Sequence, residues 1–291
     1  MTGAQDLRRG APELTADPAP LLGWFSRAAR VTVAFSGGVD SALVLAAAAR
    51  ALGAGNVHAV TAVSPSLPAG MLEAARQLAA DLKVRHTEMP TAEMDDPGYR
   101  ANGADRCYFC KSALLGALLA LDGIADRGTV VTGTNADDKQ AGWRPGIRAA
   151  AERGAQTPLA DVGLGKQKVR EISRAWQLPT WDRPASPCLS SRVAYGIQIT
   201  PARLARVDEA EQAVRRALEA SGISVHDLRV RDLGDSARVE VDAGILAAVR
   251  RCPGVRAAVA AAGFGPAEVE VQAFRSGGLN AALPAELRFA K

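Results

Sequence analysis

Short β-branched runs alternate with longer stretches rich in alanine and leucine through the first half of the chain. Each short run is typical of a buried strand, and these strands are predicted at residues 31–33, 57–63, 84–89 and 129–134. Each longer stretch predicts a helix, at residues 21–30, 40–52, 68–82, 107–122 and 166–177. This alternation predicts right-handed βαβ units, and therefore an α/β fold with a parallel, doubly wound sheet.

The pattern changes after an irregular segment with three prolines, at residues 178–187. Thr200 and Pro201 are typical of a helix start, and that helix is predicted to run to Ala220. Alternating strands and short helices follow, at residues 226–233, 237–241, 244–251 and 268–274. We therefore expect, in chain order, a flexible leader, a large α/β domain and a smaller α+β domain for substrate binding or oligomerisation, at residues 1–20, 21–187 and 188–291.

The composition of the chain indicates where the protein is expected to lie in the cell and which classes of partner it is expected to bind. No apolar run reaches the roughly 18 residues that a membrane span needs, and the first 20 residues lack the apolar segment of a secretory signal. We therefore expect a cytoplasmic protein with no membrane partner. The net charge of +4 does not separate anionic small molecules from RNA, but aromatic residues make up only 4% of the chain. This scarcity argues against a surface that stacks nucleic-acid bases.

The turn between the first predicted strand and its helix reads Ser36-Gly37-Gly38-Val39-Asp40-Ser41. Glycines there let backbone N–H groups approach an anion, and the helix N-terminus adds a partial positive charge. A Walker P-loop is excluded because no Gly-Lys-Ser/Thr is present. The turn is instead similar to the PP-loop of ATP pyrophosphatases, which cleave ATP between the α and β phosphates. Glycines that serve only tight packing are the less favoured alternative, since six positions match between a strand and a helix.

A second polar loop is expected at the same edge of the sheet, because the strand at 129–134 is followed by Asn135, Ala136, Asp137 and Asp138. Two adjacent carboxylates there are suited to holding Mg²⁺ on phosphate groups. An ordinary helix-capping turn explains the same residues equally well.

Four cysteines stand at positions 107, 110, 188 and 252, and a cytosolic protein uses such residues for reactivity or metal binding more often than for disulfides. Cys188 lies near Arg192 in a loop, which predicts a lowered thiol pKa. The C-x-x-C pair Cys107 and Cys110 together with Cys188 suggests a [4Fe–4S] cluster with one open iron. Zinc with three cysteines and a histidine, and a pair of incidental helix residues, are the alternatives. Cys252 is interpreted as a packing residue.

The second domain carries a basic pair. Arg229 and Arg231 lie two residues apart on a predicted strand, so both guanidinium groups face the same side. Paired arginines suit a phosphate monoester, which they bind bidentately. Glu211 and Glu240 either neutralise these arginines or bind a cation. From the residues alone, a solvated sheet face with salt bridges is slightly favoured.

An ordered set of motifs resembles the LarE family of ATP-dependent sulfurtransferases, which act in the synthesis of the nickel-pincer nucleotide cofactor of lactate racemase. The resemblance covers about residues 24–280. It is carried by the segments 35–41, 106–111, 133–138, 144–146, 158–159, 188–192, 195–196 and 199–200.

The resemblance implies that ATP adenylylates a carboxylate of pyridinium-3,5-biscarboxylic acid mononucleotide, with release of pyrophosphate, and that a sulfur nucleophile then displaces AMP. In one branch of the family a cysteine matching Cys188 gives up its own sulfur. In the other branch, two further cysteines join it to hold a [4Fe–4S] cluster, and the pair Cys107 and Cys110 places this chain there. The implied cofactors are ATP, Mg²⁺ and this cluster.

The resemblance also implies roles for individual residues. ATP is expected at the turn 36–41 with Gly133 and Asn135, and Cys188 is expected to be catalytic. The substrate phosphate is expected at Ser191, Arg192, Arg229 and Arg231, and a divalent cation at Glu211 and Glu240. The implied partners are a sulfide or other sulfur donor, further enzymes of nickel-pincer synthesis and further copies of this chain.

A PP-loop tRNA thiolase is the alternative enzyme, although a broad basic surface or an RNA-binding domain is expected in such a protein. A nucleotide sensor without catalysis and a zinc-stabilised scaffold are the alternatives from other classes. Pyrophosphate release separates the enzymes from the sensor, and the iron and zinc content identifies the scaffold.

Overall fold

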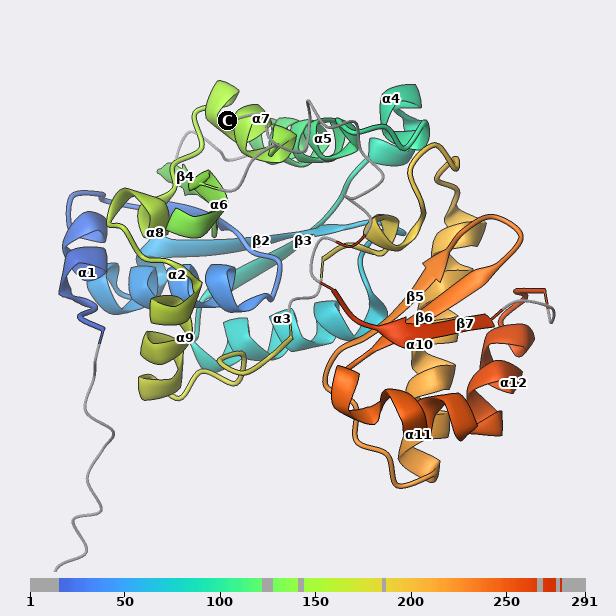
Figure 1. Ribbon diagram of the computed structural model, residues 1–291. Coiled ribbons are helices and arrows are strands. Elements are labelled where there is room, and N and C mark those ends of the chain that lie inside the picture. Colours follow the sequence, from blue (N-terminus) through green and yellow to red (C-terminus); the bar gives the residue numbers. More distant parts are fainter. Residues whose placement is uncertain are drawn as a thin grey trace, which may run out of the picture.

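The computed structural model describes residues 16–121, 128–140, 144–184, 187–265, 269–275 and 278. Two lobes lie side by side (Figure 1), one built on a parallel sheet and the other on a smaller mixed sheet. Most of the predicted leader, residues 1–15, lies outside the described residues, whereas Ala16 is buried and the first helix starts at Ala19.

The sheet of the N-terminal lobe has four parallel strands in the order β3-β2-β1-β4. These strands are β1 (Val31–Ala34), β2 (Val57–Val63), β3 (Arg85–Pro90) and β4 (Thr129–Val131). The predicted α/β class is thereby confirmed. The fourth strand is shorter than expected and ends at Val131, which forms an isolated parallel bridge with Gln156.

Helices cover both faces of this sheet because successive strand residues point to opposite sides. Val33 packs into a core with α1 (Ala19–Phe25), α2 (Val39–Leu52), α3 (Ala69–Asp81), α8 (Pro158–Asp161) and α9 (Lys166–Ala175). Its neighbour Ala34 packs on the other side against α5 (Arg106–Ala120) and α7 (Pro145–Glu152). Short turns and helices complete the lobe: η1 (Ala54–Asn56), η2 (Glu93–Asp95), α4 (Pro97–Arg100) and α6 (Ala136–Gln140). The sheet is therefore doubly wound.

The C-terminal lobe packs a long helix and two shorter ones against a three-stranded sheet. Strands β5 (Leu228–Asp232) and β6 (Ala237–Val241) are antiparallel, and β7 (Val269–Ala273) runs parallel to β6. The helices are α10 (Pro201–Ala220), α11 (Leu246–Arg251) and α12 (Pro253–Ala261), and the turns are η4 (Leu189–Arg192) and η5 (Ala243–Ile245). The predicted cap is present, because the Thr200 hydroxyl accepts from the N–H of Arg203 at 3.2 Å.

The core of the C-terminal lobe reaches across the predicted domain border. Tyr99, from α4 of the N-terminal lobe, is 1% exposed and packs with Leu189, Val193 and the buried residues of α10. Cys252 is buried in the same core, as the sequence interpretation had it.

A buried hydrogen-bond network joins the two lobes at this place. The side-chain amide of Asn102 donates to the carbonyls of Ala194 at 2.8 Å and Ile197 at 2.9 Å. Arg106 donates from Nη1 to the Asn102 side chain and to the carbonyl of Ser190 at 2.9 Å. The hydroxyls of Tyr99 and Ser190 are hydrogen-bonded as well. We refer to these four side chains as the clasp, namely Tyr99, Asn102, Arg106 and Ser190.

Among the helices that the structure describes, none is both long enough and apolar enough to cross a lipid bilayer.

We predict that Asp232→Asn lowers the free energy of unfolding by about 3 kcal/mol, because it removes one partner of a buried ion pair. Asp232 is fully buried, and it accepts from Arg203 at 2.9 Å and from Arg206 at 2.6 Å. Urea unfolding measures the loss. The control is Asp235→Asn, in the exposed turn that follows, and an equal loss in both variants would contradict the prediction.

Candidate active site

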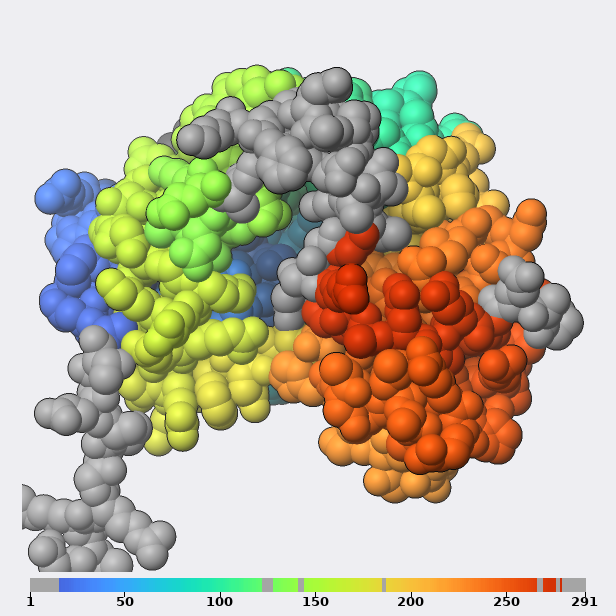
Figure 2. Space-filling view, in the orientation of Figure 1, coloured from blue at the N-terminus to red at the C-terminus, as the bar shows by residue number. Residues whose placement is uncertain are grey.

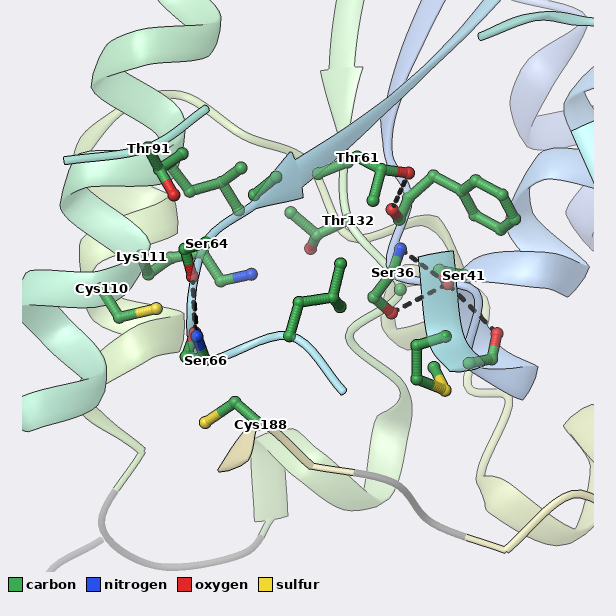
Figure 3. A pocket seen from close by; sticks show the side chains of 18 of the residues that line it. Ser36, Ser41, Thr61, Ser64, Ser66, Thr91, Cys110, Lys111, Thr132 and Cys188 are labelled. Carbon is green, nitrogen blue, oxygen red and sulfur yellow. Dashed lines mark hydrogen bonds between the residues drawn. The ribbon is translucent and has the colours of Figure 1, made fainter. Parts of the chain in front are cut away.

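A cavity of about 360 Å³ lies at the carboxyl ends of the parallel strands, where ligands bind in doubly wound sheets. Figure 3 shows two ends of this cavity. Ser36 and Ser41 lie at one end, whereas Cys110, Cys188, Ser64, Ser66 and Lys111 lie at the other. Residues from the turn after β1 and from the junction with the C-terminal lobe therefore share one cavity.

The glycine turn has the form that anion binding needs. Gly37 has a φ of +73°, in the left-handed region that favours glycine. Gly38 is the N-cap of the 14-residue helix α2 and supplies no side-chain acceptor, so the first N–H groups of that helix keep their donors for a ligand. Ser41 donates to the Gly38 carbonyl at 3.1 Å and hydrogen-bonds the Ser36 hydroxyl at 3.1 Å. The two hydroxyls thus hold the turn in shape beside the cavity.

Gly133 is required by close packing rather than by its backbone angles. A Cβ there would lie 2.7 Å from the backbone nitrogen of Ser41. The loop after β4 therefore rests directly on the glycine turn, and both segments line the cavity.

Lys166 is a site residue that the sequence reasoning missed. Its Nζ lies 2.5 Å from Asp40 Oδ2, and the amide of Asn135 donates to Asp40 Oδ1 at 3.2 Å. Lys166 begins α9, which is 126 residues away from Asp40 along the chain, so no local motif marks the pair. The pair puts a cationic side chain next to the glycine turn.

The acidic loop after β4 forms the capping turn that was one of the two alternatives for it. The Asn135 side chain accepts from the N–H of Asp138 at 3.0 Å, and Asp138 accepts from the N–H of Asn135 at 3.3 Å. These reciprocal bonds start α6. Asp137 accepts from the backbone N–H of Lys166 at 2.7 Å, whereas Asp138 lines the cavity. Asp138 therefore caps the helix and also lines the cavity, with Nη2 of Arg144 at 3.6 Å from its Oδ1.

The three thiols of interest come from two segments that the clasp holds together. Cys107 and Cys110 lie on α5, directly after Arg106, and Cys188 immediately precedes η4. The N–H of Leu189 also donates to the carbonyl of Ser66 at 2.8 Å. Cys110 and Cys188 line the cavity, whereas Cys107 is exposed at the surface, and all three are free thiols.

The surroundings of Cys107 and Cys110 disfavour the negatively charged thiolate form of both side chains. Burial raises the pKa of Cys110, and the nearby Cys188, Glu93 and Cys107 raise it further. Packing around its thiol also raises the pKa of Cys107, which Arg106 partly offsets and Cys188 increases. A bound cationic group would offset these effects, since a negative sulfur in such surroundings needs a positive partner.

The predicted phosphate-binding arginines form a buried cluster on β5 and η4. Arg192 is 1% exposed and donates to Glu211 at 2.9 Å and to the carbonyl of Cys188 at 3.1 Å. Arg231 bonds Glu240 at 2.7 Å and the carbonyl of Ser191 at 2.9 Å. The bonds to the carbonyls of Cys188 and Ser191 connect both arginines to the segment that carries Cys188.

Arg229 completes this cluster. Burial and the neighbouring charge of Arg192 lower the pKa of Arg229 to about 10. The cluster holds three arginines and two carboxylates, so one guanidinium charge in it exceeds the carboxylate charges. An anion bound there would relieve the repulsion between the guanidinium groups.

The sequence left two roles open for Glu211 and Glu240, neutralising the arginines or binding a cation. In the structure both carboxylates neutralise arginines. Glu211 accepts from Arg192 and from the N–H of Val230 at 3.0 Å, and Glu240 accepts from Arg231. Their use as ligands of a divalent cation stays a prediction.

The cavity gathers only part of the predicted site. Seven of the predicted residues line it: Ser36, Gly38, Asp40, Ser41, Gly133, Cys110 and Cys188. Three predicted residues of the turn and its neighbour loop do not line it. Val39 is 4% exposed and packs in the core, the carbonyl of Gly37 accepts from Arg183, and the side chain of Asn135 donates to Asp40. The arginine cluster and Cys107 lie outside this cavity as the structure describes it. Lys111 and Glu93 also line the cavity beside the thiols, and no motif in the sequence pointed to Glu93.

Comparison with known proteins gives two matches that cover only part of the chain. The sequence model of a family described as asparagine synthase matches residues 26–107. The glutamine-dependent NAD(+) synthetase of Rhodobacter capsulatus is 45% identical over 75 residues, which cover 26% of this chain and 13% of the synthetase. Both matches are partial.

Two other relatives match most of the chain. Pyridinium-3,5-bisthiocarboxylic acid mononucleotide synthase of Lactiplantibacillus plantarum is 31% identical over 252 residues, covering 86% of this chain and 89% of the synthase. An uncharacterised protein of Synechocystis is 44% identical over 218 residues, covering 75% of this chain and 78% of that protein.

We predict that Lys166→Met weakens ATP binding about tenfold, because it leaves the negative charge of Asp40 without its cationic partner on the wall of the cavity beside the glycine turn. Isothermal titration calorimetry measures the dissociation constant. Lys168→Met, on an exposed position of the same helix, is the matched control and is expected to bind ATP as the unchanged protein does. Unchanged affinity in Lys166→Met would contradict the prediction.

We predict that Cys110 in the metal-free folded protein reacts with iodoacetamide at pH 8 at least about tenfold more slowly than in unfolded protein, because only the thiolate is alkylated. The rate is expected to rise with pH as the raised pKa is approached. Since the thiol has a pKa of 9.0 when unfolded and a raised pKa when folded, the free energy of unfolding should fall as the pH rises above about 9. Peptide mass spectrometry follows the reaction, and equal folded and unfolded rates would refute the prediction.

Proposed function

The chain belongs to the LarE family of ATP-dependent sulfurtransferases, and on that premise we propose that it converts the two carboxylates of pyridinium-3,5-biscarboxylic acid mononucleotide into thiocarboxylates. One observation carries this proposal. A single cavity joins the glycine turn, which suits ATP, to Cys110 and Cys188, which suit sulfur chemistry.

In the first half of the proposed reaction, a substrate carboxylate oxygen attacks the α-phosphorus of ATP, and pyrophosphate leaves. The N-terminus of α2 and the side chain of Lys166 are the groups that stabilise the developing charge on pyrophosphate. Asp138 is the carboxylate on the cavity wall that would hold Mg²⁺, which neutralises phosphate charge.

In the second half, a hydrosulfide attacks the activated acyl carbon, a C–S bond forms, and AMP leaves with the former carboxylate oxygen. A good leaving group and a strong nucleophile meet in this step. Cys188 stands at the thiol end of the cavity, opposite the glycine turn, where the acyl adenylate is exposed to sulfur. Repetition on the second carboxylate gives the bis-thiocarboxylate.

The donor set fits a [4Fe–4S] cluster as the place where sulfur is held. All three thiols are free, and after burial the neighbouring Cys188 raises the pKa of both Cys107 and Cys110, which favours a shared cationic partner. When bound, a cluster held by three cysteines supplies an open iron for an exchangeable sulfide. The clasp keeps α5 and η4 together, and so keeps the three thiols together.

Arg229, Arg231 and Arg192, with Ser191, are proposed to bind the phosphate of the mononucleotide. Support comes from the burial of three arginines beside only two carboxylates, where burial and the charge of Arg192 lower the pKa of Arg229 to about 10, and from the bond between Arg231 and the Ser191 carbonyl. The product would pass to other enzymes of nickel-pincer synthesis, and we expect a homo-oligomer in the cytoplasm.

A second candidate is the sacrificial reaction, in which Cys188 gives up its own sulfur. The position of Cys188 on the wall of the same cavity as the glycine turn favours it, since Cys107 does not line that cavity. The two candidates share the ATP step and differ only in the source of sulfur.

Anaerobically prepared protein, incubated with ATP, sulfide and the substrate, is expected to release pyrophosphate and form thiocarboxylate, both followed by mass spectrometry. Its absorbance should show a broad band at about 400 nm from thiolate-bound iron and sulfide. Cys107→Ala, Cys110→Ala and Cys188→Ala should each lose this band and sulfur transfer while keeping pyrophosphate release. Cys252→Ala, in the core of the other lobe, is the control that keeps both.

Different results separate the alternatives. Protein without iron whose Cys188 loses the mass of H₂S during turnover would replace the cluster by the sacrificial reaction. Absence of pyrophosphate release with the substrate would refute the proposed function itself.

A further inference from the structure

Glu93 stands out among the buried ionisable groups that the proposed mechanism does not use. It lies in η2, directly after β3, and is only 2% exposed. It lines the cavity at the thiol end. The pKa of Cys110 is raised there first by burial, then by Cys188 and then by Glu93. A charged side chain in such a place needs partners, because an isolated buried carboxylate is strongly unfavourable.

Only one of its two oxygens has a partner among the described residues. Oε1 accepts from the hydroxyl of Ser66 at 3.3 Å, and that hydroxyl also hydrogen-bonds Ser64 at 2.8 Å. Oε2 is buried and accepts no hydrogen bond from the part of the chain that the structure describes. A buried carboxylate oxygen that accepts no hydrogen bond is unfavourable, so its retention at a cavity wall indicates a ligand group that completes it.

The charge of Glu93 restricts what that ligand group is. A carboxylate repels the phosphates of ATP and the carboxylates of the substrate, and it attracts a cation or a hydrogen-bond donor. The mononucleotide of the proposed reaction contains one fixed cation, its pyridinium ring. In that ring a single carbon separates the nitrogen from each carbon that bears a carboxylate, so a ring whose acyl group faces the thiols brings its positive charge to the same place.

We propose that Glu93 is a specificity-determining residue whose free oxygen, Oε2, binds the cationic pyridinium ring of the substrate. This inference rests on the proposed function, since it takes the mononucleotide as the ligand. Cys110 and Cys188 then face the acyl group, and Glu93 selects a positively charged ring over a neutral one. Ser66 holds the carboxylate in position through Oε1.

The test compares two ligands on the metal-free protein by isothermal titration calorimetry, without turnover. One is pyridinium-3,5-biscarboxylic acid mononucleotide, and the other is its analogue with a neutral benzene ring. Glu93→Gln is expected to weaken binding of the pyridinium ligand about tenfold and to leave the neutral analogue unchanged. Asp95→Asn, which removes an exposed carboxylate from the same turn, is the matched control and should change neither.

A stability readout guards against misfolding. Because Glu93→Gln replaces a buried carboxylate, one oxygen of which has no hydrogen-bond partner among the described residues, the ligand-free variant is expected to melt at or above the temperature of the unchanged protein. Glu93→Met, a second neutral side chain of similar length, has to reproduce the selective loss.

Each other outcome has a defined meaning. Equal affinity of the unchanged protein and Glu93→Gln for the pyridinium ligand overturns the inference, and so does an equal loss for both ligands. An unchanged protein that prefers neither ligand overturns it alone, whereas one that binds neither overturns the proposed function and the inference together.

Discussion

The clasp is the interaction on which the geometry of the site depends. Asn102 and Arg106 donate to backbone carbonyls of the segment that follows Cys188, and Tyr99 bonds the Ser190 hydroxyl within the same buried patch. Buried hydrogen bonds of this kind are costly to leave unmade, so the two segments have one favoured arrangement. These bonds therefore also fix the position of the thiols on α5 relative to the thiol before η4. The junction of the lobes (Figure 2) is therefore part of the site rather than a simple boundary.

The two ends of the cavity offer different groups to a ligand. The N-terminus of α2 makes the glycine turn attractive to phosphate, whereas the thiol end holds the buried carboxylate of Glu93 beside Cys110, whose pKa is raised first by burial. A substrate with a cationic ring and anionic substituents matches both ends at once. The arginine cluster behind Ser191 adds a third charged region, suited to a phosphate.

Local patterns in the sequence predicted the features that depend on neighbouring residues. The strands, the capped start of α10 and the glycine turn follow from short-range periodicity and turn chemistry, and all were found close to their expected positions. Contacts between distant segments were out of reach, as the pair of Asp40 and Lys166 shows. The loop at Asn135 was ambiguous because capping and metal binding use the same residue types, and only its hydrogen bonds distinguish them. Tyr99 gave no signal that it belongs to the core of the other lobe.

The wide sequence separation within the clasp also sets the order in which the site assembles. Tyr99 and Ser190 are 91 residues apart, so their contact closes a long loop and belongs to the slow, non-local part of folding. During synthesis, α5 leaves the ribosome well before the segment that begins at Cys188. A nascent chain at that stage presents Cys107 and Cys110 before Cys188 can lie near them, because the clasp forms only once the segment after Cys188 has been made.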